Sequence, residues 1–149
     1  MSVEVQQPAL QQTVPMITGL HHAGLTVRDV EASERWYERV LGLTRAFLEP
    51  HDNGTGYAVV MTRPGTALFL GLDHHADADG QVFEERRTGL DHLALRVETR
   101  EDIDQWAAHL DALGVKRAPV HETFEPVPYA LIVFRDPDEI QLEVMWFGA

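Results

Sequence analysis

The chain has 149 residues, of which 44% are hydrophobic, and this composition is typical of one globular domain with a packed core. It has no cysteine, so disulfide bonds and thiolate metal sites are excluded, and a bound metal must use imidazole, carboxylate or water. The formal net charge of −12 repels phosphate backbones and anionic lipids, so we expect neither nucleic acid nor a membrane as a partner.

The N-terminal residues 1–16 are polar, rich in glutamine and interrupted by two prolines. They lack the basic region and the long apolar run of a signal peptide, so we expect a mobile tail. No segment reaches the roughly 18 consecutive apolar residues of a transmembrane helix. The default expectation is a cytoplasmic protein.

Residues 17–149 are predicted to form a single domain made of two repeated halves. Residues 19–27 align without gaps with residues 89–97, so that His22 is the repeat partner of His92 at an offset of 70. After an insertion of two residues, 57–63 align with 129–135 at an offset of 72. Self-similarity of this kind indicates two copies of one structural unit.

The first half, residues 17–72, predicts a strand, a helix and three further strands. Apolar residues alternate with small or polar ones over 22–27, which indicates a strand. A helix follows over 30–41, with Asp29 as its N-cap and Gly42 as its stop. A tight turn at Pro64 and Gly65 separates the last two strands, and the last strand covers 67–72.

The second half, residues 89–147, repeats this order after a polar linker at 73–88. Its helix is expected over 100–113, between Thr99 as N-cap and Gly114 as stop. The turn at 136–138 precedes a final apolar strand. The fold class is therefore predicted to be α+β, built from two tandem βαβββ modules.

Three residues form the predicted metal site. His22 and His92 occupy one repeat position, and equivalent positions approach each other when two copies pack about a pseudo-twofold axis. Glu143 interrupts an apolar strand, where burying an ionised carboxylate costs several kcal/mol unless a cation accompanies it. Two imidazoles and one carboxylate suit a divalent transition ion such as Fe(II). The repeat partner of Glu143 is Gly71, so one side of the metal is expected to stay open to substrate.

The order of these motifs resembles one known superfamily. Gly-Leu-His-His at 19–22, Trp-Tyr at 36–37, Leu-Asp-His at 90–92, and Arg-Asp-Pro-Asp at 135–138 leading to Gln-Leu-Glu at 141–143 resemble the vicinal oxygen chelate superfamily. Its members include glyoxalase I, bleomycin-resistance proteins, fosfomycin-resistance enzymes, methylmalonyl-CoA epimerase and extradiol dioxygenases. The resemblance covers 17–147 and implies a cupped, barrel-like mixed sheet around a metal bound at positions 22, 71, 92 and 143. It also implies a homodimer.

Departures from the family patterns distinguish among its members. Glyoxalase I and the epimerase use a carboxylate or amide where this chain has Gly71. Fosfomycin-resistance enzymes share the His, His and Glu ligands, but need basic residues and a potassium loop, whereas 122–129 is acidic and apolar here. Extradiol dioxygenases share the three-ligand pattern with Fe(II), although their acid/base His and Tyr do not line up with this chain, which has Val133 ten residues before Glu143.

Tyr129 and His121 are the candidate catalytic residues in place of that His and Tyr. Tyr129 has the same strand parity as Val133, so its hydroxyl could hold a substrate oxygen, or it could be a core aromatic like its repeat partner Tyr57. His121 could move a proton near neutral pH, or it could be an exposed loop residue.

The leading hypothesis is a mononuclear Fe(II) dioxygenase-like oxidoreductase acting on an oxygenated aromatic or polyketide-like small molecule. One alternative is a glyoxalase-like lyase or isomerase that uses Mn(II), Zn(II) or Ni(II). Another is a protein of the bleomycin-resistance type, which binds a cationic drug without catalysis. The spacing leaves open whether the metal site forms within one chain or across a dimer.

Overall fold

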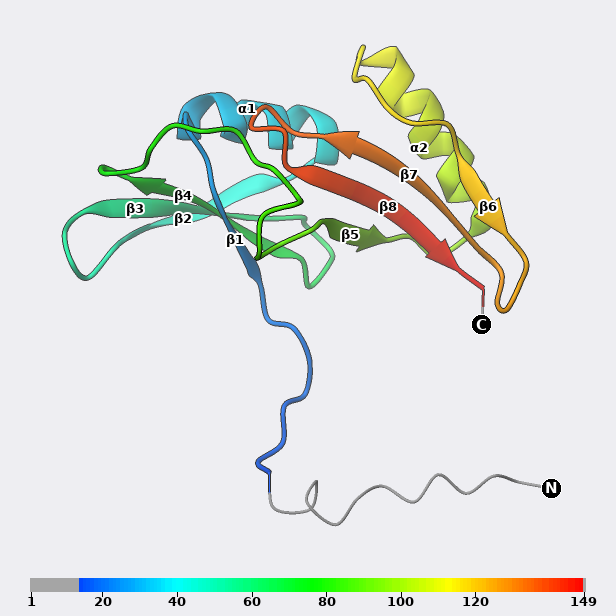
Figure 1. Cartoon of the computed structure of the whole chain (residues 1–149), viewed down its shortest axis with the longest axis horizontal. Coiled ribbons are helices and arrows are strands. Elements are labelled where there is room, and N and C mark those ends of the chain that lie inside the picture. Colours follow the sequence, from blue (N-terminus) through cyan, green and yellow to red (C-terminus); the bar gives the residue numbers. More distant parts are fainter. Residues whose placement is uncertain (1–13, 149) are drawn as a thin grey trace.

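The computed structural model describes residues 14–148. Most of the predicted tail, residues 1–13, lies outside the described residues, and residues 14–22 lead into the first strand without a helix or strand of their own. The elements, labelled in Figure 1, are β1 (Ala23–Thr26), α1 (Val30–Leu41), β2 (Thr44–Pro50), β3 (Gly56–Thr62), β4 (Phe69–His75), β5 (Leu93–Arg96), α2 (Arg100–Ala112), β6 (His121–Thr123), β7 (Tyr129–Arg135) and β8 (Gln141–Phe147).

The strands form two four-stranded sheets with the same topology. Sheet A has the order β1-β4-β3-β2, and sheet B has the order β5-β8-β7-β6. In each sheet the first strand pairs in parallel with the last, and the other pairs are antiparallel. Gly24 lies opposite Gly71 in sheet A, and Ala94 lies opposite Glu143 at the equivalent place in sheet B. The predicted α+β class and the tandem βαβββ modules are therefore confirmed.

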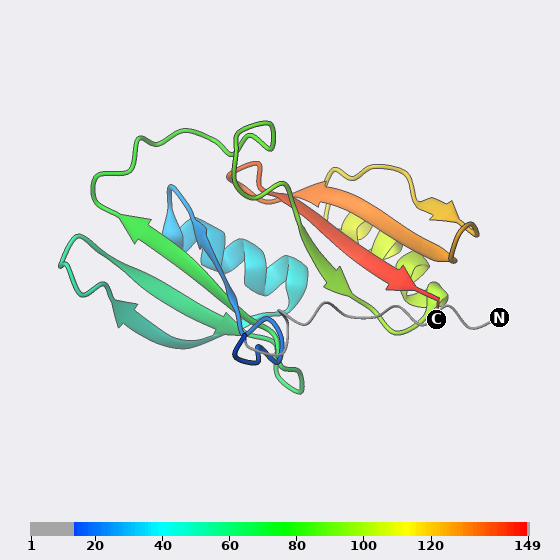
Figure 2. The ribbon, with the colours of Figure 1, turned by 60° about the horizontal axis from the view of Figure 1, so that its bottom comes forward.

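The two sheets remain separate within one chain. Among residues 14–148 no strand pairing joins sheet A to sheet B, so the chain does not close one cupped, barrel-like sheet on its own. Figure 2 shows the two modules side by side. In Figure 1, α1 and α2 lie on the same side of the sheets, and the opposite face of each sheet carries no helix. We call this the helix-free face.

The helices begin and end where the sequence predicts, to within one residue. The Asp29 side chain accepts a hydrogen bond from the Ala32 N–H, and Gly42 adopts the left-handed conformation at the C-cap of α1. Thr99 and Asp102 form a capping box at the start of α2, which ends at Ala112 with Leu113 as its C-cap. Both helices cover the faces of their sheets that hold the buried core.

Strand β4 is longer than predicted, because it continues to His75. Residues 73–75, expected in the linker, therefore belong to the sheet. Part of the remaining connection is held against module two, since the Phe83 N–H donates to the Asp138 carbonyl at 2.8 Å. Glu85 and Arg135 form an ion pair at 2.8 Å.

Polar side chains, most of them buried, join the two modules. The Tyr37 hydroxyl, in α1, donates to Asp136 Oδ2 at 2.8 Å, and Arg28 Nε contacts Asp138 Oδ1 at 2.6 Å. Burial raises the pKa of the Asp136 carboxyl to about 6, and burial together with Asp136 raises the pKa of Tyr37. The turn between β7 and β8 is therefore fixed to module one by two buried carboxylates, Asp136 paired with the buried Tyr37 and Asp138 paired with the exposed Arg28.

The described residues include no helix whose length and apolar character would allow it to cross a membrane.

Candidate metal centre

His92 and Glu143 lie together on the helix-free face of sheet B. Glu143 is in β8, and His92 immediately precedes β5, the strand that pairs with β8. The distance from His92 Nε2 to Glu143 Oε2 is 3.7 Å. Two ligand atoms that each lie about 2.1 Å from one ion are about 3.0 to 3.4 Å apart. A shift of a few tenths of an ångström would therefore allow both residues to bind a single ion.

Glu143 is an acid embedded in an apolar strand. Only 9% of the residue is exposed, and the neighbouring Leu142 and Val144 belong to the core on the other face of the sheet. Val133 lies opposite Glu143 on β7, and its side chain has neither a charge nor a hydrogen-bonding group. Among residues 14–148 the only basic side chain within 4 Å of the Glu143 carboxylate is His92, which is charged only when its ring is protonated. The chemistry of this pair suits a cation, because a buried carboxylate needs a positive group beside it.

Asp91 orients the His92 ring. Its Oδ1 lies 2.7 Å from His92 Nδ1, and this hydrogen bond is the main reason why the pKa of His92 is raised. A ring that donates its Nδ1 proton to a carboxylate has a free lone pair on Nε2, the atom that faces Glu143. The sequence analysis missed this role, although Asp91 is the residue directly before the predicted ligand.

His22 lies in the other module and does not join this pair. It is exposed, and its Nδ1 lies 2.9 Å from Nδ1 of His21, the repeat partner of Asp91. His22, His92 and Glu143 do not form a three-ligand cluster within residues 14–148 of one chain. A single chain therefore holds one ligand of the predicted site on module one and two ligands on module two.

Gly71 lies on the helix-free face of sheet A, as the repeat partner of Glu143 should. The space above it contains the Asp73 carboxylate, whose Oδ2 lies 3.2 Å from the place where a Cβ of residue 71 would be. A side-chain oxygen from two residues further along β4 thus approaches the predicted open position.

Tyr129 and His121 are neighbours on the helix-free face of sheet B, with ring centroids 5.8 Å apart. His121 is in the edge strand β6 rather than in a loop, and Tyr129 is half-buried on the same face of β7 as Val133. Tyr129 pairs with Phe147, four residues beyond Glu143, which corresponds to about 13 Å along β8. Within one chain these residues are therefore close to each other but not to Glu143.

The structure also brings together three residues that the sequence analysis did not group. Donor atoms of His51, Asp73 and His75 all lie within 4.8 Å of one another, and these three form the only such group among residues 14–148. The repeat gave no direct indication, because Asp73 and His75 correspond to the apolar Met145 and Phe147. The available signal was that Asp73 and His75, two residues apart, are polar where the repeat has apolar residues.

Comparison with known families gives one match that covers most of the chain. The family described as the Glyoxalase/Bleomycin resistance protein/Dioxygenase superfamily matches residues 19–144. No curated protein matches the chain significantly.

Solved structures give the same fold. A glyoxylase/bleomycin resistance protein/dioxygenase domain from Frankia sp. EAN1pec is 32% identical, with a TM-score of 0.77 over 89% of this chain and 94% of that one. The fosfomycin resistance protein FosX from Listeria monocytogenes, in complex with Mn(II) and sulfate, is 21% identical, with a TM-score of 0.62 over 90% and 95% of the two chains. A glyoxalase family protein from Enterococcus faecalis is 19% identical, with a TM-score of 0.66 over 86% and 97%.

Proposed function

Because the chain belongs to the glyoxalase/bleomycin resistance protein/dioxygenase superfamily, we propose that it is a metal-dependent enzyme whose divalent ion is bound by His22, His92 and Glu143. The observation that carries this proposal is the arrangement of His92 and Glu143. Their donor atoms lie 3.7 Å apart on the helix-free face, and Asp91 holds the imidazole in the tautomer that binds metals.

We further propose that the site is completed by a second copy of the chain. In a symmetric dimer, module one of each protomer can face module two of its partner, which creates two equivalent sites. The helix-free faces suit such an interface because they are uncovered, and Phe47 of the edge strand β2, which lies opposite Val60 on that face, is 51% exposed. His22 would then complete the ligand set of the partner's module two.

A divalent ion in this ligand set would act as a Lewis acid toward adjacent substrate oxygens. The chain supplies the rest. Glu143 and His92 would hold the ion, and Tyr129 and His121 could hold a substrate oxygen and move a proton further along sheet B. The substrate class that we propose is an oxygenated aromatic or polyketide-like small molecule.

For the reaction, we propose an Fe(II)-dependent dioxygenase, because a two-His-one-carboxylate set with open positions is the pattern of non-heme Fe(II) oxygenases. A second candidate is a lyase or isomerase that uses Mn(II), Zn(II) or Ni(II). Two observations favour it: the FosX structure contains Mn(II), and Val133 supplies no proton-transfer group opposite Glu143.

The test is to purify the chain anaerobically, measure its metal content, and follow O2 consumption with a panel of catechols. Fe(II) uptake with substrate-dependent O2 consumption supports the dioxygenase. Metal uptake without O2 consumption, together with turnover of an oxo-acid or epoxide panel under Mn(II), supports the second candidate. If the chain takes up no metal after reconstitution, the enzyme proposal is wrong, and a drug-binding protein without catalysis is the remaining hypothesis.

A further inference from the structure

A second group of potential metal ligands lies entirely within module one. We propose that His51, Asp73 and His75 bind a second divalent transition-metal ion on the helix-free face of sheet A. This inference does not rest on the proposed function, because none of the three residues belongs to the His22, His92 and Glu143 set.

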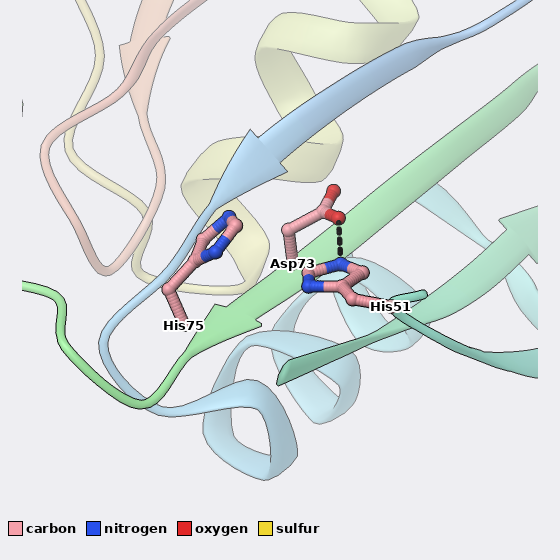
Figure 3. Close-up of side chains that lie close together, drawn as sticks. All are labelled: His51, Asp73 and His75. Carbon is pink, nitrogen blue, oxygen red and sulfur yellow. Dashed lines mark hydrogen bonds and ion pairs between the residues drawn. The ribbon is translucent and has the colours of Figure 1, made fainter. Parts of the chain in front are cut away.

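The geometry brings one donor atom from each side chain to a common region. His51 directly follows β2, and Asp73 and His75 are alternate residues of β4, so that both point to the same face of the sheet (Figure 3). His51 Nε2 lies 3.0 Å from Asp73 Oδ1, and the His51 and His75 ring centroids are 4.8 Å apart. All three donor atoms lie within 4.8 Å of one another.

Two glycines make room for the Asp73 carboxylate of this cluster. A Cβ on Gly24 would lie 2.9 Å from Asp73 Oδ2, and a Cβ on Gly71 would lie 3.2 Å from the same oxygen. Side chains at these two places would displace the carboxylate, so the absence of Cβ atoms allows it to approach the sheet closely.

The donor set indicates the class of ion. Two imidazoles and one carboxylate suit Zn(II), Fe(II), Co(II) or Ni(II) rather than Ca(II) or Mg(II), which prefer oxygen ligands. All three residues are half-buried, so the site has an open side for water or a substrate oxygen. A single His–Asp hydrogen bond would need only His51 and Asp73. This hydrogen bond does not explain why a third potential ligand, His75, lies on the same face.

The cluster should bind metal independently of module two and of a partner chain. All its ligands come from module one, whereas His92 and Glu143 lie on module two. It is nevertheless adjacent to Gly71, the position that the repeat relates to Glu143, because the Asp73 carboxylate extends over that residue. An ion in the cluster would therefore lie on the helix-free face of sheet A, beside Gly71.

The test titrates the metal-free full-length chain with Zn(II) by calorimetry and with Co(II) by visible absorption. The background is the double variant His92→Ala, Glu143→Gln, which removes the two ligands of module two. In this background we expect about one Zn(II) per chain. Adding His75→Ala or Asp73→Asn should weaken binding by at least about 100-fold, since changes that only disturb the orientation of ligands already cost about 10- to 100-fold.

His74→Ala is the matched control, because His74 is the neighbouring histidine on the opposite face of β4, beside the Tyr57 ring. It should leave the Zn(II) affinity of the background unchanged. Gly24→Ala keeps all three ligands but crowds Asp73 Oδ2, so it should weaken binding by about 10-fold. Circular dichroism on each variant verifies that it is folded.

Two results would overturn the inference. One is a background variant that binds no Zn(II), and the other is Zn(II) binding that His75→Ala and Asp73→Asn leave unchanged. The experiment tests the cluster and the proposed catalytic metal site separately. If the background still binds Zn(II) and loses it with His75→Ala, while the wild-type chain binds no additional ion, the cluster is established and the proposed function is wrong.

Discussion

A single carboxylate determines how the His92 imidazole is presented. The repeat identifies His92 as equivalent to His22, but it does not show which ring nitrogen is free. The 2.7 Å contact between Asp91 Oδ1 and His92 Nδ1 answers this question, because it directs Nε2 toward Glu143. Orientation of this kind depends on side-chain rotamers, which a periodic pattern does not specify.

Replacing Asp91 by alanine should therefore weaken metal binding at the proposed catalytic site by about 10- to 100-fold, the usual cost of losing a group that orients a ligand. Metal titration in a His75→Ala background measures this site without the second cluster. Asp91→Asn should restore part of the affinity, because its side-chain carbonyl can still accept the Nδ1 hydrogen bond. Equal affinities for wild type and Asp91→Ala would contradict the assigned role.

At the level of elements, local patterns predicted the helices better than the ends of the strands. Asp29, Gly42 and Thr99 cap α1 and α2 as predicted, because capping depends on neighbours within three or four residues. The sequence pattern predicts that β4 ends at Leu72, because 73–75 are polar and resemble a loop, but the strand continues to His75. Pairing with β3, from Ala58 opposite Asp73 to Gly56 opposite His75, extends the strand.

The turn between β7 and β8 should make the stability of the fold depend on pH. The pKa of Asp136 is raised by burial to about 6 from an ordinary value of 3.8, so the folded chain binds this proton more tightly than the unfolded chain does. Its contribution to the free energy of unfolding is largest below pH 4 and is lost as pH rises to about 6. The size of this loss is about 3 kcal/mol.

Urea unfolding of wild type and Asp136→Asn between pH 4 and pH 7 measures this effect as the difference between the two proteins. The variant should not show this fall in the free energy of unfolding between pH 4 and pH 7, because the amide does not ionise. The amide oxygen can still accept hydrogen bonds from the Asp138 and Ile140 N–H groups. A difference that does not change with pH would show that Asp136 titrates normally. Tyr37→Phe should extend the loss to higher pH, since the Tyr37 hydroxyl lowers the pKa of Asp136.

For the whole molecule, the separation of His22 from His92 and Glu143 leads to a prediction about assembly. In the proposed dimer, a homodimer of His22→Ala chains or of Glu143→Gln chains has no intact metal site. A heterodimer of the two has one intact site, because the Glu143→Gln chain supplies an unchanged module one and the His22→Ala chain supplies an unchanged module two. We expect about one metal-binding site at module two per heterodimer, measured in a His75→Ala background. Two affinity tags allow the heterodimer to be purified.

The control is the mixture of His92→Ala and Glu143→Gln chains. Both substitutions lie on module two, so each of the two sites in that heterodimer has one defect and no intact site can form. Metal binding by the first heterodimer but not by the second would support a shared site. Failure of both heterodimers, with a normal wild-type dimer, would indicate a site that forms within one chain.

The internal repeat and the helix-capping residues made the modules, their order and the candidate ligands readable from the amino-acid sequence, because these signals come from residues that are near in the chain or related by a constant offset. The division of the strands into two sheets, the 3.7 Å approach of His92 to Glu143, and the meeting of His51 with Asp73 and His75 came from the folded structure. Each depends on strand register and on packing between distant segments, which many side chains determine together and no local pattern encodes.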